Sequence, residues 1–439
     1  MPDEPDVLEL LDLRGLQADD PLVLPRPDLG AEGPVEEVRA ILRAVRERGD
    51  DALRELTARF DGAELGEIRV PADDLDAALA RIPADLREAL TEARDAIEAF
   101  HRHRAPLPGR YERGGITVDH LEIPVDRAGL YAPGGRARYP SSVLMTAMPA
   151  RVAGVGSVAL CVPPGPDGVI ADEILAAAAL AGVDEVYGVG GAQAIAAMAY
   201  GTASIPKVDV IVGPGSKWVS IAQREVRGVV GVPAAFAGPS EVVVVADGST
   251  PPEWAAIDVI VQAEHGPDGL AWLVTWSEEA ARAITEATTR LVAASPRRAD
   301  TRATLAGGGY CVLVDGPEQA MRVANAIAPE HLELLVEEPD VLLGLVRHAG
   351  AVFVGPLAPA SVGDYIAGPS HVLPTFATAR FSSVLGVEDF VRRVHAVRVD
   401  AAGIARVAPA VAAIADAEGL PAHAESVRLR VGKATWSTA

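Results

Sequence analysis

Hydrophobic residues recur three and four positions apart along the first quarter of the chain, which is the pattern of amphipathic helices. The pattern is clearest over residues 35–56 and 75–100, and glycine and proline mark its breaks. We therefore expect a helical region from about residue 32 to 104. A similar pattern over residues 404–431 predicts a C-terminal helical arm that packs on another part of the assembly.

After about residue 123, short runs rich in Val and Ile alternate with Ala-rich amphipathic stretches at the spacing of β-α-β units. A first series predicts strands 155–162, 185–189 and 208–212 and helices 171–181, 192–199 and 218–226. A second series predicts strands 241–246, 270–276, 310–314 and 351–354 and helices 253–265, 278–294 and 318–328. The expected fold class is α/β, with two parallel-sheet units.

Composition and charge narrow the class of protein. The 439 residues are enough for two or three domains, and 49% hydrophobic residues exclude a disordered or fibrous chain. The net charge of −22 argues against a nucleic-acid partner or an anionic membrane surface, because both would be repelled. The longest apolar stretch near a helical pattern, 174–183, is about half of the roughly 20 residues that a membrane span needs.

The compartment is indicated by the N-terminus and the cysteines. Residues 1–6 are acidic, whereas a signal peptide begins with basic and then apolar residues. Cys161 and Cys311 lie in apolar runs that resemble buried strands more than a disulfide framework. We expect a cytoplasmic protein in a reducing compartment.

Three glycine-rich turns follow predicted strands, at 131–135, 188–193 and 213–216. Such turns allow backbone amides to approach a phosphate, but none of the three fits the G-x-G-x-x-G fingerprint. In the second turn Gln193 replaces the third glycine, and after Gly213 the corresponding residue is Trp218. Nucleotide binding and tight turns that only need positive φ both remain open.

Polar residues with metal-binding or acid–base chemistry cluster in the second half of the chain. Gln262 and His265 are three apart and share a helix face, although a histidine in a last turn also suits the helix dipole. Glu330 and His331 are adjacent at the end of an apolar helix, so a shared site would require an irregular backbone. The alternative for this pair is a solvated carboxylate beside a capping imidazole.

Two more segments contribute side chains that could bind a metal or act as acid or base. Asp364, Ser370 and His371 follow a predicted strand, where we expect the carboxyl edge of the sheet, and Glu418 and His423 lie in the C-terminal arm. Gln, His, Asp and His offer oxygen and imidazole donors without thiolate, which suits Zn²⁺ or Mn²⁺ with open positions for substrate. Spacing alone does not show that these residues converge.

In order and spacing, several segments together resemble the histidinol dehydrogenase family over about residues 25–431. They are 129–135 (GLYAPGG), 189–195 (VGGAQAI), 237–241 (AGPSE), 262–265 (QAEH), 329–332 (PEHL), 363–365 (GDY), 371–375 (HVLPT) and 417–420 (AEGL). The resemblance implies two incomplete Rossmann-like, aldehyde-dehydrogenase-like domains and a homodimer in which each arm reaches the partner's active site. The implied division is 1–24 as an N-terminal segment, 25–131 plus 240–385 as the larger domain with most of the site, 132–239 as the second domain and 386–439 as the arm.

The resemblance also implies a site. Zn²⁺, one per subunit, would be held by Gln262, His265 and Asp364 of one chain and His423 of the other. The substrate L-histidinol would contact these four residues and also Ser240, His331 and Glu418, and His371 is expected close by. NAD⁺ would touch Tyr131, Gln193 and Ser216.

The implied reaction is a four-electron oxidation of L-histidinol to L-histidine through bound histidinaldehyde, the last steps of histidine biosynthesis. His331 would take the alcohol proton, and Glu330 would activate the water that attacks the aldehyde. Ser216 and Ser370 stand where the family usually has Asn. A zinc dehydrogenase for another polar alcohol, and a zinc-binding protein without catalysis, are the alternatives.

Overall fold

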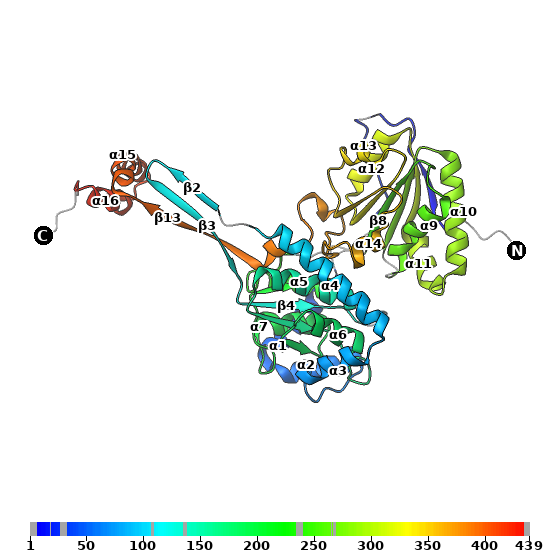
Figure 1. Cartoon of the computed structure of the whole chain (residues 1–439), viewed down its shortest axis with the longest axis horizontal. Helices are drawn as coiled ribbons and strands as arrows, with labels where there is room; N and C mark the ends of the chain where they lie inside the picture. The colour runs from blue at the N-terminus through cyan, green and yellow to red at the C-terminus, as the bar shows by residue number, and fades with distance from the viewer. Residues whose placement is uncertain are drawn as a thin grey trace. The chain divides into compact units, whose positions relative to one another are not determined.

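The computed structural model describes residues 7–17, 19–26, 33–106, 109–134, 138–233, 240–264, 266 and 269–433. The chain divides into two units (Figure 1). The first is made of residues 1–104 and 125–390, and the second of residues 105–124 and 391–439.

A four-stranded parallel sheet in the order β6-β5-β4-β7 lies in the first unit. Its strands are β4 (Arg127–Tyr131), β5 (Ser157–Cys161), β6 (Glu185–Tyr187) and β7 (Val210–Val212). Its helices are α5 (Pro140–Ala153), α6 (Asp172–Leu180), α7 (Gly191–Tyr200) and α8 (Lys217–Val226). The first strand lies between the second and the fourth, which creates the switch point typical of Rossmann-like sheets.

The same unit holds a six-stranded parallel sheet in the order β1-β10-β9-β8-β11-β12. Its strands are β1 (Glu9–Asp12), β8 (Glu241–Ala246), β9 (Leu270–Thr275), β10 (Gly309–Leu313), β11 (His331–Leu335) and β12 (Ala351–Val354). Its helices are α9 (Pro252–Val261), α10 (Glu278–Ala294), α11 (Arg298–Gly308), α12 (Pro317–Ile327), α13 (Pro339–Leu343) and α14 (Ala360–Tyr365). The α/β prediction is confirmed, with a second switch point between β8 and β11.

Three short 3-10 helices complete this unit: η1 (Gln262–Glu264), η2 (Thr378–Arg380) and η3 (Val387–Phe390). The helix expected over 253–265 therefore ends at Val261 and tightens into η1. Strand β11 has no counterpart among the predicted strands. Its sequence, HLELL, contains two polar residues, and the alternation was not distinguished from the end of the preceding helix.

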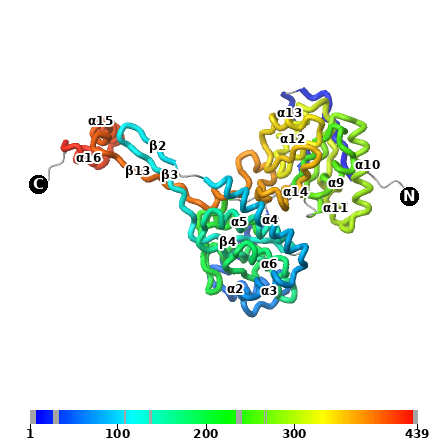
Figure 2. The backbone as a smooth tube through the Cα atoms, in the orientation of Figure 1, coloured from blue at the N-terminus to red at the C-terminus, as the bar shows by residue number. Residues whose placement is uncertain are grey.

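The N-terminal helices pack with the four-stranded sheet. They are α1 (Val35–Arg48), α2 (Asp50–Asp61), α3 (Ala72–Arg81) and α4 (Ala84–Arg104). Their apolar faces join the two cores on either side of that sheet, whereas β1 pairs with β10. Figure 2 shows the backbone of α2, α3 and α4 in the same region as β4 and α6. The resemblance implied that residues 25–131 belong with the larger sheet, whereas α1–α4 and β4 belong with the four-stranded sheet in this structure. An amphipathic pattern shows that a helix buries one face but not which sheet it covers.

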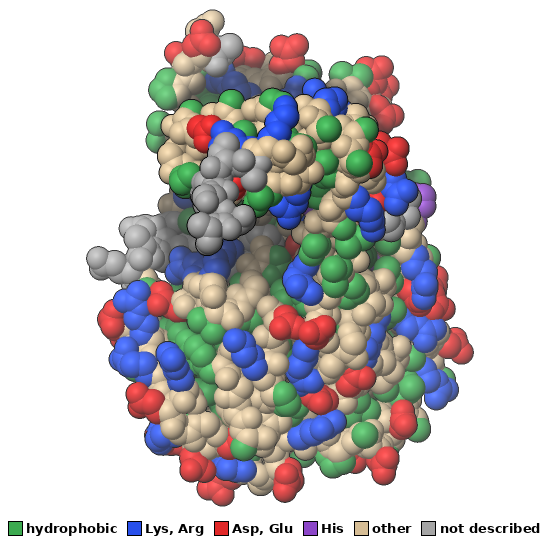
Figure 3. All heavy atoms as spheres, turned by 90° about the vertical axis from the view of Figure 1, so that its left-hand side faces the viewer, with side chains coloured by type: hydrophobic (Ala, Val, Ile, Leu, Met, Phe, Trp, Pro, Cys, Tyr) green, Lys and Arg blue, Asp and Glu red, His purple; other side chains and the backbone are tan. Residues whose placement is uncertain are grey.

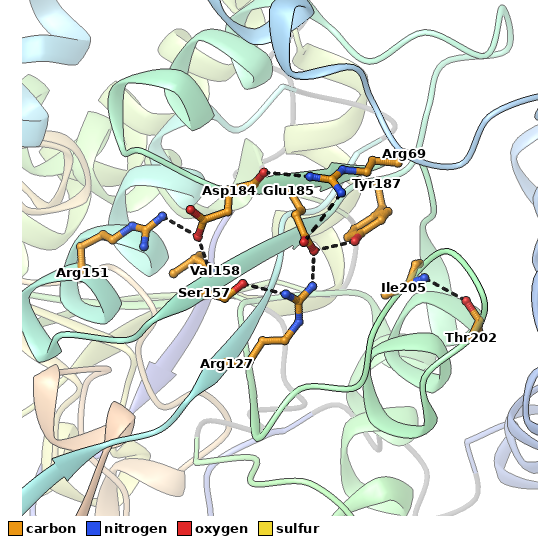
Figure 4. Close-up of polar contacts among 10 residues, drawn as sticks. All are labelled: Arg69, Arg127, Arg151, Ser157, Val158, Asp184, Glu185, Tyr187, Thr202 and Ile205. Atoms are coloured by element: carbon orange, nitrogen blue, oxygen red, sulfur yellow. Dashed lines mark hydrogen bonds and ion pairs between the residues drawn. The ribbon is translucent and has the colours of Figure 1, made fainter.

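Ion pairs close the amino edge of the four-stranded sheet (Figure 4). Arg127 at the start of β4 contacts Glu185 at the start of β6, and its Nη1 donates to Ser157 Oγ at 2.6 Å. Tyr187 Oη donates to the same Glu185 carboxylate at 2.6 Å, and Arg69 Nη1 lies 3.8 Å from it. These contacts join three strands at the edge opposite Tyr131.

An antiparallel sheet, β13-β3-β2, and two helices form the second unit. Its elements are β2 (Gly109–Arg113), β3 (Ile116–Pro124), β13 (Val391–Val399), α15 (Ala401–Ala417) and α16 (Pro421–Arg430). The helical arm expected over 404–431 is present as α15 and α16, and the three strands were not predicted. The helices bury a small cluster of Ala412, Ala415 and Ala424.

The surface view shows acidic and basic side chains interspersed on the face turned to the viewer (Figure 3). Among the helices that the structure describes, each is too short or too polar to cross a membrane.

Candidate active site

Four of the predicted site residues converge at the amino edge of the six-stranded sheet: Gln262, Glu330, His331 and Asp364. His331 is the first residue of β11, which pairs with β8, and Glu241 is the first residue of β8. The sequence placed Asp364 and His371 at the carboxyl edge of a sheet, and this prediction was wrong. The chain after β12 turns back through α14, so that Asp364 reaches His331 at the opposite edge.

His331 is buried at the centre of this site, with 2% of its surface exposed. Its Nε2 lies 3.1 Å from Asp364 Oδ1, and its Nδ1 lies 3.6 Å from Glu330 Oε2. Burial opposes the charged imidazolium, but the two carboxylates outweigh it and raise the pKa of His331 well above its usual value. The ring stacks on Phe353 of β12, with centroids 5.8 Å apart.

Glu330 reaches the site because the backbone is irregular at this point, as the sequence required. Helix α12 ends at Ile327, and Ala328 adopts a left-handed conformation with φ 52°. The Glu330 carboxylate then accepts a hydrogen bond from the backbone N–H of Glu241 at 3.1 Å. The pair is therefore neither a solvated carboxylate nor a helix cap.

Glu241 is a buried carboxyl group behind Glu330, and no role was predicted for it. Its side chain accepts a hydrogen bond from Phe376 N–H at 3.0 Å, and Arg26 Nη1 lies 3.9 Å away. Burial, together with the nearby Glu330, raises the pKa of Glu241 to about 7, although Arg26 lowers it. The sequence did carry an indication, since an ionisable residue opens an otherwise apolar strand, EVVVVA.

Gln262 lies at the C-terminus of α9 and is 1% exposed. Its Nε2 donates to Asp364 Oδ2 at 3.4 Å, whereas its buried Oε1 has no hydrogen-bond partner among the residues that the structure describes. A buried amide oxygen beside a carboxylate is a site where a cation would complete the coordination. His265 lies outside the described residues. Within the described ranges, no three His, Cys, Asp or Glu side chains are arranged as metal ligands, so any metal here also needs Gln262 or further donors.

His371 is a second buried imidazole close to Asp364. Its Nδ1 donates to the Asp364 backbone carbonyl at 2.9 Å, and its Nε2 lies 3.1 Å from Ser142 Oγ of α5. Burial lowers the pKa of His371. The preceding Ser370 also reaches α5, by donating to the Met145 carbonyl at 3.1 Å. These contacts join the loop after α14 to a helix of the four-stranded sheet.

The other residues predicted to contact the substrate are Ser240, Glu418 and His423. Ser240 is half-buried beside Glu241, and its carbonyl accepts from Leu270 N–H. Glu418 follows α15 and His423 belongs to α16, so both lie in the second unit, with exposed side chains. Glu418 and His423 therefore belong to a different unit from the cluster around His331.

The predicted cofactor residues lie at the carboxyl edge of the four-stranded sheet. Tyr131 ends β4, and its Oη accepts from Gly191 N–H at 3.1 Å. Gln193 in α7 is 1% exposed, and within the described part of the chain its Nε2 has no hydrogen-bond partner. Ser216 precedes α8 and is exposed. An unpaired buried amide beside Tyr131 fits a ligand with hydrogen-bond acceptors.

The glycines of these turns are explained mostly by packing. Gly191 and Gly213 have φ of 62° and 121°, which side-chain-bearing residues rarely adopt. At Gly134 and Gly190 a Cβ atom would lie 2.5 Å and 2.4 Å from Pro163. The cofactor argument at this edge therefore depends on Gln193 and Tyr131 more than on the glycine pattern.

Comparison with known proteins gives consistent matches over nearly the whole chain. The family model described as histidinol dehydrogenase matches residues 24–431. A histidinol dehydrogenase of Synechococcus sp. is 50% identical over 396 residues, 90% of this chain and 91% of that protein, and one of Gluconobacter oxydans is 48% identical over 401 residues, 91% and 93%. The crystal structure of histidinol dehydrogenase from Elizabethkingia anophelis has a TM-score of 0.92 and 32% identity, and the match covers 98% of this chain and 99% of that one.

Proposed function

The chain belongs to the histidinol dehydrogenase family, and we propose that it oxidises L-histidinol to L-histidine with NAD⁺ and one Zn²⁺ per subunit. Family membership makes it an oxidoreductase of histidine biosynthesis. The observation that carries the proposal is the convergence of Glu330, His331 and Asp364, with Gln262 beside them, at one buried edge of the sheet.

Zn²⁺ would be held by Gln262, His265 and Asp364 of one subunit, together with His423 of the partner subunit. The orphaned Gln262 Oε1 beside the Asp364 carboxylate supports this assignment. When bound, Zn²⁺ acts as a Lewis acid that holds the nitrogen atoms of the substrate. Ser240 and Glu418 complete the substrate site in this proposal, with Glu418 facing the imidazole.

NAD⁺ would bind at Tyr131, Gln193 and Ser216, and when bound it accepts hydride from the carbon that bears the oxygen. The unpaired Gln193 amide supports this site. The hydrogen bond that Ser142 donates to His371 supports a common site for both sheets. Helix α5, which carries Ser142, begins at the carboxyl edge of the four-stranded sheet, while Asp364 lies at the amino edge of the other.

In its neutral form His331 acts as the general base for the alcohol, and because its pKa is raised this form is populated at alkaline pH. It accepts the hydroxyl proton while hydride leaves the same carbon, and Asp364 and Glu330 orient the ring and stabilise its positive charge. Glu330 then takes a proton from the water that adds to the aldehyde. The resulting gem-diol gives up a second hydride, so that each alcohol consumes two NAD⁺ and one water.

A homodimer with shared sites is part of the proposal. The second unit buries only three alanines in its helical cluster, with Val427 packed against them. It exposes several large apolar side chains: Val397, Val399, Ile414, Leu420 and Leu429. A unit with so small a core gains stability by burying these residues against a second copy.

The decisive assay incubates the purified protein with Zn²⁺, L-histidinol and NAD⁺ and counts NADH against histidinol consumed. We expect two NADH and one L-histidine per histidinol, with loss of activity after chelation. A ratio of one would exclude the four-electron reaction. Turnover of other polar alcohols at a similar kcat/KM would exclude L-histidinol as the specific substrate.

A further inference from the structure

Two buried carboxyl groups, Asp258 on α9 and Glu333 on β11, lie in side-chain contact with one another. Asp258 lies on α9 with 5% of its surface exposed, and Glu333 lies in the middle of β11 with none exposed. Neither residue has a role in the proposed reaction. Asp258 lies on α9, which leads to Gln262, and Glu333 lies on β11, which begins with His331.

Hydrogen-bond chemistry restricts how this pair can exist. Neither oxygen of Glu333 receives a hydrogen bond from a described N–H or O–H group. Two ionised carboxylates are both acceptors, so a contact between them is favourable only if one carries a proton. Burial, with the adjacent Asp258, raises the pKa of Glu333 to about 9, and burial raises the pKa of Asp258 as well. A single proton shared by the pair satisfies both groups at neutral pH.

The groups around Glu333 are few. Asp258 faces it from α9, and His331 lies on the same face of its own strand. Helix α14 brings the backbone N–H of Ala360 near Glu333, outside hydrogen-bond geometry but close enough to favour the ionised form to a small extent. The residues paired with Glu333 on the neighbouring strands are Val244 and Phe353, which carry no charge.

Asp258 and Glu333 lie on the same elements as Gln262 and His331, and at spacings that place them on the same faces. Asp258 and Gln262 are four residues apart at the end of α9, Glu333 and His331 are two apart on β11, and these spacings place each couple on one face. On α14, Ala360 and Asp364 are also four apart. The site layer, Gln262, His331 and Asp364, therefore lies beside a support layer, Asp258, Glu333 and Ala360.

We propose that Asp258 and Glu333 form a proton-sharing pair that positions the site, by fixing the end of α9, and so Gln262, relative to His331 on β11. This inference rests on the proposed function. The pair touches neither substrate nor cofactor, and it acts through the two residues that do. A shift of about 1 Å between catalytic groups costs up to about 100-fold in rate, so a rigid connection at this point has a direct effect on turnover.

The test compares substitutions that keep or remove a hydrogen-bond donor. Glu333→Gln places an amide donor opposite Asp258, and Asp258→Asn does the same opposite Glu333. Glu333→Met keeps the length of the side chain but cannot form the bond. Leu334→Val is the matched control, because Leu334 is equally buried on the same strand and faces the other core.

We expect Glu333→Gln and Asp258→Asn to keep kcat for L-histidinol within about threefold, and Leu334→Val to leave it unchanged. Glu333→Met should lower kcat by about tenfold or more and weaken the binding of Zn²⁺ alone, measured by calorimetry on the full chain, by a similar factor. The KM for NAD⁺ should stay constant, because the cofactor residues lie on the other sheet. Wild-type kcat and Zn²⁺ affinity in Glu333→Met, or equal loss in Glu333→Gln, would overturn the inference.

A second measurement tests the inference even if the Glu333→Met variant does not fold. The free energy of unfolding of the wild type should fall relative to that of Glu333→Gln as the pH rises from about 5 to about 9, because the folded pair binds a proton that the unfolded carboxyls release. Identical pH profiles would exclude a shared proton. If the wild type fails to oxidise L-histidinol, the proposed function fails, while Zn²⁺ binding and the unfolding profiles still decide this inference.

Discussion

Ser142 Oγ lies 3.1 Å from His371 Nε2 and donates a hydrogen bond to it. The direction of this bond is determined, because His371 Nδ1 faces the carbonyl oxygen of Asp364 at 2.9 Å and must carry the ring proton. A neutral imidazole thus connects a helix of the four-stranded sheet to the segment that carries Asp364.

Replacing Ser142 by Ala should loosen this connection. The buried Nε2 of His371 would lose its donor, which costs about 1–2 kcal/mol in the free energy of unfolding. We also expect a severalfold higher KM for L-histidinol, since Asp364 is less well fixed. Thr146→Val is the control, because the Thr146 hydroxyl bonds only to carbonyls within α5. Equal effects of the two substitutions in urea unfolding and in KM would contradict this role.

His331→Asn should remove the base for the alcohol. Asn keeps hydrogen-bonding capacity toward Asp364 but does not accept a proton near neutral pH, so we expect kcat for L-histidinol to fall by about 100-fold or more. Steady-state kinetics at saturating NAD⁺ measures this directly. Oxidation at the wild-type rate would show that another group takes the proton.

Glu330→Gln should separate the two oxidation steps. If Glu330 activates water, oxidation of supplied histidinal slows by about 100-fold, while oxidation of histidinol to the aldehyde slows less. Single-turnover measurements of NADH formation from each substrate distinguish the steps. The assignment fails if both are slowed equally, because Glu330 would then act mainly by orienting His331, which lies 3.6 Å away.

Mixed dimers test whether the site is shared between subunits. Asp364→Ala and His423→Ala should each be inactive alone, because each removes a proposed Zn²⁺ ligand. When the two variants are unfolded together and refolded, a heterodimer contains one complete site, and up to about a quarter of wild-type activity should return. Mixtures that stay inactive, although heterodimers are detected by mass, would place all four ligands in one chain.

Glu241→Gln should alter the pH dependence of stability. The pKa of Glu241 is raised to about 7 in the folded chain, mainly by burial, so its contribution to stability is present at low pH and is lost as pH rises through 7. Relative to the wild type, the variant should gain on the order of 3 kcal/mol in the free energy of unfolding between about pH 5 and pH 8. Urea titrations at the two pH values measure the change, and parallel profiles would contradict it.

Much of the fold followed from the sequence because its pattern is local. The apolar runs that form β5, β8, β9 and β10 and the helices between them lie close to the predicted ranges. The same approach failed for β11, whose two polar residues interrupt an apolar run. It also failed for the antiparallel strands β2, β3 and β13, which have few buried positions and therefore a weak pattern.

The sequence by itself determined the α/β class, the two parallel-sheet series and, through its ordered motifs, the family. Only the tertiary structure decided that Gln262, Glu330, His331 and Asp364 meet at the amino edge of the larger sheet, with Glu241 and the Asp258–Glu333 pair behind them. The reason is physical. Helix and strand periodicities report which face of an element is buried, whereas the burial and pKa of a carboxyl group depend on which distant elements enclose it.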